Sequence, residues 1–121
     1  MADTTRTRAQ LRIAIASKLG LLMEGNTVSG NDSTIIDDGI DNIFRELEDQ
    51  GLLRFDIEGD AIEVNVFSPI VFLVADSLAE DFGLPTESAA RIAAKAQMAL
   101  AKIKEAAFEG AQNTVTQIEY F

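Results

Sequence analysis

The sequence predicts a mainly α-helical fold: a four-helix bundle with a short β-hairpin between helices 2 and 3 and an extended C-terminal arm. Apolar residues recur at the helical spacing of 3.6 over most of the chain, one stretch alternates with a period of two, and the last residues are rich in β-formers. A length of 121 residues fits one domain. We expect a helical domain over residues 1–110, with its hairpin near 53–66, and an arm over 111–121.

Two helices are expected before residue 52. The first covers residues 5–22, with N-caps available from Thr4, Thr5 and Thr7. A polar loop follows, and the second helix begins at Asp32 or Ser33 and ends at Gly51. The apolar stripe of the first helix is Leu11, Ile15, Leu19 and Leu22, and that of the second is Ile36, Ile40, Ile43 and Leu47, with Phe44 beside them.

The hairpin is expected where the apolar period changes to two. Residues 53–58 and 61–66 each alternate apolar and polar side chains, and Gly59-Asp60 stands between them as a turn. One apolar face of this hairpin is expected to rest on the helices.

Two further helices are expected after the hairpin. Ser68-Pro69 is a strong helix start, because serine caps free amides and proline at the first position lacks only a donor that would be unpaired. This third helix continues to Phe82, and Gly83 is placed to end it. The fourth covers residues 85–110. The inward stripe of the third is Val71, Val74, Ala75, Leu78 and Phe82, and that of the fourth is Ile92, Ala96, Ala99, Leu100, Ile103 and Ala107.

The last eleven residues predict an extended arm. Residues 114–121 are rich in β-formers and follow a helix terminator. A lone terminal strand has unsatisfied backbone groups and exposed apolar surface, so a partner chain would supply the missing edge. The alternative is that the arm folds back on its own hairpin or frays.

Composition argues against an enzyme. The chain has no cysteine and no histidine, which excludes disulfides, thiolate nucleophiles, imidazole bases and zinc sites built from these ligands. No serine lies in a nucleophile-elbow or Ser-x-x-Lys pattern, and no phosphate-binding glycine loop is present. We therefore expect no catalytic residue and no cofactor.

Carboxylates are the remaining candidates for a metal site. The segment that begins at Asp56 superficially resembles a calcium loop, but Phe67 stands at its twelfth position, where a carboxylate ligand is needed. A second acidic cluster lies on the second helix, where such a run at helical spacing is usually a solvated face. Its members are Asp37, Asp38, Asp41 and Glu48. We expect no metal ion at either place.

The net charge argues against the remaining alternative, a nucleic-acid-binding protein. Helices followed by a hairpin have the order of a winged-helix domain, so a small winged-helix transcriptional regulator is a second hypothesis. With 20 acidic and 10 basic residues the net charge is −10, and the hairpin tip carries Asp56, Glu58 and Asp60, which would repel phosphates. Arg8 and Arg12 of the first helix are expected on a solvated face or an interface.

The N-terminal residues predict no signal peptide, and the longest apolar run is too short to span a membrane.

Several segments resemble one protein family. Residues 74–84, VADSLAEDFGL, look like the Leu-Ala-x-x-Leu-Ala-x-x-Phe/Tyr-Gly segment of head-to-tail adaptor proteins of tailed bacteriophages. The alanine-rich helix after Ser88, the Leu19-Gly20-Leu21-Leu22 end of the first helix, and residues 41–52 are also similar to that family. Leu47 stands where family members often carry tryptophan, so packing between the second helix and the hairpin is expected to differ.

The resemblance implies a structural virion protein of the phage neck, made in the host cytoplasm. Such a subunit forms a homo-oligomeric ring, commonly dodecameric, between the portal protein and the tail or stopper proteins. The ring extends the DNA channel, helps to retain packaged DNA, and lets DNA pass without sequence-specific binding. The C-terminal segment of the family reaches toward the portal, which implies that the portal-binding residues are Val115, Gln117, Ile118, Tyr120 and Phe121.

Overall fold

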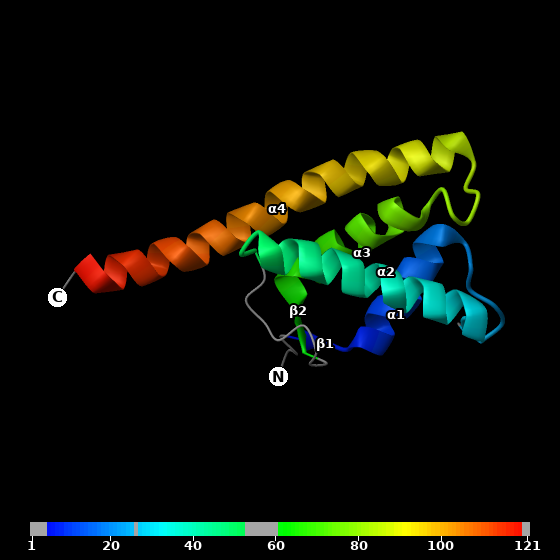
Figure 1. The fold of residues 1–121 in the computed structure, drawn as a ribbon, viewed down its shortest axis with the longest axis horizontal. Coiled ribbons are helices and arrows are strands. Elements are labelled where there is room, and N and C mark those ends of the chain that lie inside the picture. Colours follow the sequence, from blue (N-terminus) through cyan, green and yellow to red (C-terminus); the bar gives the residue numbers. More distant parts are fainter. Residues whose placement is uncertain (1–4, 26, 53–60, 120–121) are drawn as a thin grey trace.

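The computed structural model describes residues 5–25, 27–52 and 61–119, with side chains described as far as residue 107. These residues form two short strands and four helices (Figure 1). The elements are β1 (Thr5–Arg6), α1 (Arg8–Leu19), α2 (Gly30–Asp49), β2 (Ile62–Glu63), α3 (Val64–Leu78) and α4 (Thr86–Glu119). The predicted fold class, mainly helical with a small antiparallel β-element, is confirmed.

Helix α3 lies at the centre of the fold. It packs against α1, α2 and α4, and Asp76 is its only charged residue, so it can be buried on several sides. The predicted apolar stripes of α1, α2 and α4 meet it in one core without a buried polar or charged side chain among the described residues. The largest fully buried side chains are Phe44, Leu11, Ile15, Ile36, Ile40, Ile62, Ile70, Ile103 and Val74.

Local signals fix the ends of the first two helices. The N-cap of α1 is Thr7, whose Oγ1 accepts a hydrogen bond of 3.1 Å from the amide of Gln10, while the Gln10 side chain accepts one of 2.8 Å from the Thr7 amide. Gly20 ends this helix at a φ of 73°. Ser29 caps α2, so this helix begins slightly earlier than predicted.

The β-element differs in its pairing. Strand β2 pairs antiparallel with β1, with Thr5 opposite Glu63 and Arg6 opposite Ile62. The predicted partner strand, residues 53–58, and its turn at Gly59-Asp60 lie outside the described residues. The N-terminal segment therefore supplies the strand that is described beside β2.

The predicted start of the third helix is wrong. Residues 64–66, expected in the hairpin, form the first turn of α3, and Pro69 lies inside this helix. The reason is that Val66 is buried together with Ile70 and Val74, which continues one helical stripe with a spacing of four residues. Burial of that stripe outweighs the local signal for a start at Ser68.

The C-terminal segment is helical as far as it is described. Helix α4 extends to Glu119, so residues 111–119, expected as an extended arm, continue the helix through Gly110. This prediction fails because β-propensity depends on a neighbouring strand, and a glycine inside a helix costs only about 1 kcal/mol. The segment lacks a proline that would stop the helix.

Candidate interaction surfaces

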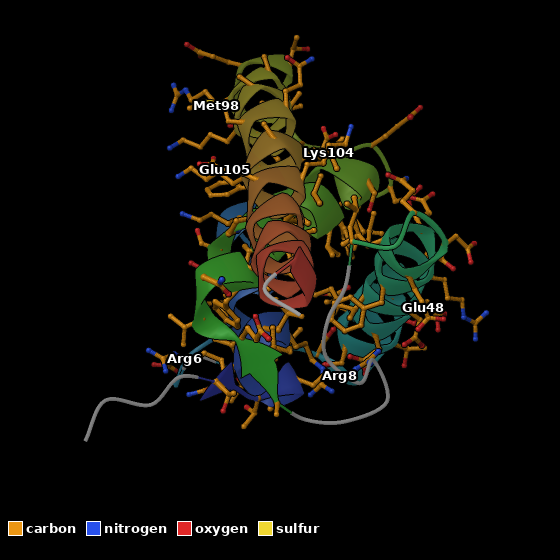
Figure 2. All side chains as sticks on the ribbon, turned by 90° about the vertical axis from the view of Figure 1, so that its left-hand side faces the viewer. Arg6, Arg8, Glu48, Met98, Lys104 and Glu105 are labelled. Atoms are coloured by element: carbon orange, nitrogen blue, oxygen red, sulfur yellow. The ribbon has the colours of Figure 1, made fainter. Side chains whose placement is uncertain are left out.

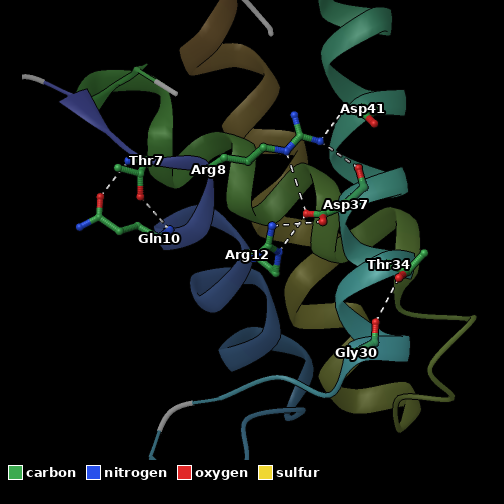
Figure 3. A network of polar contacts seen from close by, with 8 residues as sticks. All are labelled: Thr7, Arg8, Gln10, Arg12, Gly30, Thr34, Asp37 and Asp41. Carbon is green, nitrogen blue, oxygen red and sulfur yellow. Dashed lines mark hydrogen bonds and ion pairs between the residues drawn. The ribbon is translucent and has the colours of Figure 1, made fainter. Parts of the chain in front are cut away.

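A network of ion pairs joins α1 to α2 (Figure 3). Arg12 makes two parallel contacts with Asp37, at 2.9 Å from Nε to Oδ1 and 3.1 Å from Nη2 to Oδ2. Arg8 donates to the Asp37 carbonyl at 3.2 Å and to Asp41 Oδ1 at 2.6 Å. These arginines therefore hold two helices together within the chain, and they occupy two carboxylates of the acidic cluster.

Metal binding finds no support in the described part of the chain. No group of three or more aspartate or glutamate residues converges there in a way that could hold a metal ion. Asp37 and Asp41 are paired with arginines, while Asp38 and Glu48 are exposed. The segment that resembles a calcium loop begins at Asp56, and its first residues lie outside the described residues.

The first surface of interest, the basic groove, lies between α3 and α4. It is a pocket of about 270 Å³. Both charged residues among its described lining residues are lysines, Lys95 and Lys102. The apolar part of the lining includes Val64 and Met98, which are 40% and 65% exposed and so are among the most exposed large apolar side chains described. The groove thus combines positive charge with uncovered apolar surface.

Phe72 anchors two lysines at this groove. The ammonium of Lys95, on α4, lies 5.4 Å from the centre of the Phe72 ring, and that of Lys18, on α1, lies 5.2 Å from it. Each contact is a cation–π interaction, which orients the lysine without neutralising its charge. Lysines from α1 and α4 therefore concentrate positive charge around one aromatic ring of α3, in a chain with a net charge of −10.

The second surface, the acidic groove, lies between α2 and α3 and the residues that follow α3. Its volume is about 370 Å³. The charged residues that line it are Asp38, Glu46 and Asp81, and its apolar part includes Ile35 and Ile43. It has the same general construction as the basic groove, an apolar lining with charged side chains, but the charge has the opposite sign.

The third surface is the C-terminal end of α4. Figure 1 shows α4 running beside α3 and then continuing past the ends of the other helices. Of the five residues predicted to bind the portal, Val115, Gln117 and Ile118 belong to this part of α4, where only the backbone is described. Tyr120 and Phe121 lie outside the described residues. No observation on side-chain contacts therefore tests this set.

The two grooves were not predicted from the sequence. Lys95, Met98 and Lys102 are separated by three and four residues, which is the spacing of one helical face, so part of the signal was present on α4. The spacing does not show which other helix packs beside this face of α4. Only the packing of α3 against α4 shows that Phe72 and Val64 lie beside these residues.

Comparisons with known proteins give no relative: no family model, no curated protein and no solved structure matches the chain. Among the described residues, no helix is both long enough and apolar enough to cross a membrane.

Proposed function

We propose that this protein is a head-to-tail adaptor of a tailed phage, a structural subunit whose copies form a ring between the portal protein and the tail or stopper proteins. The ring would extend the DNA channel and help to retain packaged DNA. The proposal starts from the resemblance of residues 74–84 and of the flanking helices to that family. In this proposal the protein acts by binding other proteins through its surfaces, and it catalyses no reaction.

The residues that carry the resemblance have clear structural roles. Leu78 and Ala79 are buried at the end of α3, and Phe82 packs against the core. Gly83 has a φ of 62°, a conformation that side chains with a Cβ rarely adopt, so this residue suits the turn between α3 and α4. These residues of the motif therefore form the end of α3 and the turn that leads to α4.

The observation that carries the proposal is the projecting end of α4. At 1.5 Å per residue, the 34 residues of this helix span about 51 Å, whereas the 15 residues of α3 span about 22 Å. The last fully buried side chain described on α4 is Ile103. A helix without tertiary packing is marginal in water, so its projecting end is best explained by a partner that covers it.

The helical backbone changes how the arm would bind. Residues 111–119 satisfy most of their amides within α4, so pairing with a strand of the portal is not required there. We expect binding through apolar side chains of Val115 and Ile118, in the manner of a helix in a groove.

The acidic surface has a role in the same proposal. Helix α2 contains seven carboxylates and one arginine. If exposed carboxylates of α2 outside the acidic groove, such as Glu48 and Asp49, line the channel, their charge keeps DNA from adhering to the wall, because carboxylates repel phosphates.

The test is attachment to the portal protein of the same phage, measured by co-sedimentation with portal rings. Removal of residues 113–121 should abolish attachment and leave the circular dichroism of the helical domain nearly unchanged. A finer variant, Val115→Asp with Ile118→Asp, should also release the protein. Thr114→Asp with Thr116→Asp is the matched control, because it adds the same charge to the same segment and should retain attachment.

Failure of the full chain to attach to the portal would overturn the adaptor function. Full attachment by the truncated chain would overturn only the role assigned to the C-terminal end of α4. Tight binding to duplex DNA at low salt would instead support the winged-helix regulator, since a channel subunit of this charge should not bind duplex.

A further inference from the structure

The basic groove has the features of an unoccupied interface. Among the described residues only four large apolar side chains are strongly exposed, and two of them, Val64 and Met98, line this groove. Exposed apolar residues gathered in one groove indicate a binding surface more strongly than scattered ones. The partner of the groove should therefore present apolar surface.

The charges of both grooves lack ion-pair partners within the described chain. Lys95 and Lys102 make no ion pair there, and neither do Asp38, Glu46 and Asp81. By contrast, the carboxylates that face α1 are paired with Arg8 and Arg12. Other exposed charges of the described residues are unpaired too, but those at the two grooves lie beside apolar surface, with positive charge at one groove and negative charge at the other.

The spacing of these charges is similar. Lys95 and Lys102 are seven residues apart on α4, which corresponds to a rise of about 10.5 Å, and Asp38 and Glu46 are eight residues apart on α2, a rise of about 12 Å. A helix α2 laid along the basic groove could therefore place both carboxylates near both lysines. Ile35 and Ile43, which lie beside these carboxylates, would meet the apolar part of the basic groove.

The two surfaces also lie apart on the molecule. In Figure 2, Met98 points out of one side, while α2, marked by Glu48, runs along the other side. One copy can therefore use both surfaces at the same time, with a different neighbour at each.

We infer that the basic groove of one copy binds the acidic α2 surface of a second copy of this chain. Such a contact is heterologous, because each copy contributes a different surface, and it generates a closed ring when the rotation between copies closes. The inference deepens the proposed function and rests on it for the ring, but it names the two surfaces that would build the ring. Complementary charge would fix the direction of assembly, and apolar burial would supply affinity.

The test uses the full chain and two charge-reversed variants, Lys95→Glu with Lys102→Glu and Asp38→Lys with Glu46→Lys. Self-association is measured by sedimentation velocity over a series of protein concentrations, at low and at high salt. We expect the unmodified chain to associate more weakly at high salt, and each variant to associate at least about tenfold more weakly than the unmodified chain. An equimolar mixture of the two variants should recover association, because every contact in an alternating assembly is again between opposite charges.

Matched controls separate position from charge. Lys104→Glu is compared with Lys102→Glu, and Glu48→Lys with Glu46→Lys; the control residues are exposed on the same helices but line neither groove (Figure 2). The controls should associate as the unmodified chain does. Circular dichroism of all variants checks that their helical content is unchanged.

Each outcome decides the inference. It is overturned if the unmodified chain stays monomeric at every concentration, if the groove variants behave as the controls do, or if the mixture fails to associate. Rings on the portal that survive both groove reversals would overturn it while leaving the proposed function standing. Association through the grooves without any binding to a portal would support it and count against the proposed function.

Discussion

Gly39 of α2 packs directly against Leu78 of α3. A Cβ added to this glycine would lie 3.0 Å from Leu78 Cδ1 and 3.3 Å from Cδ2 and Cγ of the same side chain. Leu78 is itself only 6% exposed, so it has little room to move. Glycine inside a helix is otherwise unfavourable by about 1 kcal/mol relative to alanine, which means that the packing must compensate for it.

We predict that Gly39→Ala destabilises the protein by about 1 kcal/mol. Overpacking in a core costs typically about 1–3 kcal/mol, and the better helix propensity of alanine returns about 1 kcal/mol of this. With an m-value of about 2 kcal/mol/M for a domain of this size, the urea midpoint should fall by roughly 0.5 M. The assay is urea unfolding followed by circular dichroism at 222 nm.

A control and a double mutant isolate the contact. Gly30→Ala, at the first residue of α2, adds a methyl group that meets no atom within 4 Å, so it should be neutral or slightly stabilising. In a Leu78→Ala background, Gly39→Ala should stabilise the protein by about 1 kcal/mol, because only the gain in propensity remains. The reasoning is refuted if Gly39→Ala raises the midpoint in the unmodified chain, or if its effect is the same in both backgrounds.

Two further predictions concern α3 and the ion pairs. Pro69→Ala should stabilise the protein by about 1 kcal/mol. The substitution gains about 3 kcal/mol of folding free energy, because it restores an amide that can bond to the Asn65 carbonyl, and it loses about 2 kcal/mol from the burial of the proline ring. A lower thermal midpoint would contradict this prediction. A double-mutant cycle of Arg12→Ala and Asp37→Ala should give a coupling of about 1 kcal/mol in urea unfolding. This value is the upper end of the range for surface ion pairs, because two parallel hydrogen bonds form and the side chains are only 31% and 34% exposed. The coupling should shrink at 1 M salt. No measurable coupling at low salt would show that the pair does not hold α1 to α2.

The helices were largely predictable because their signals are local. The stripe of α1 recurs at the helical period, Thr7 has glutamine three residues later, and Gly20 can adopt a left-handed conformation. Core positions such as Ile36 and Ile103 follow from the same periodicity. Each of these signals needs only the neighbouring turn of the chain to act.

The predictions that were wrong depend on residues that are far apart in the sequence. The strand before α3 pairs with Arg6, more than fifty residues earlier, and no local pattern marks that partner. The start of α3 depends on the burial of Val66 against other helices, which outweighs the helix-start signal of Ser68 and Pro69. The grooves, likewise, exist only after α2, α3 and α4 have packed, so a sequence can show the charge of Lys95 but not what lies beside it.

Electron microscopy of portal rings, alone and after addition of the purified full chain, tests the central claim most directly. The account predicts an additional coaxial ring of density on one end of the portal, present only when the chain is added and absent when residues 113–121 are removed. Portal rings that remain bare, with the chain free in solution, would contradict the proposed adaptor function.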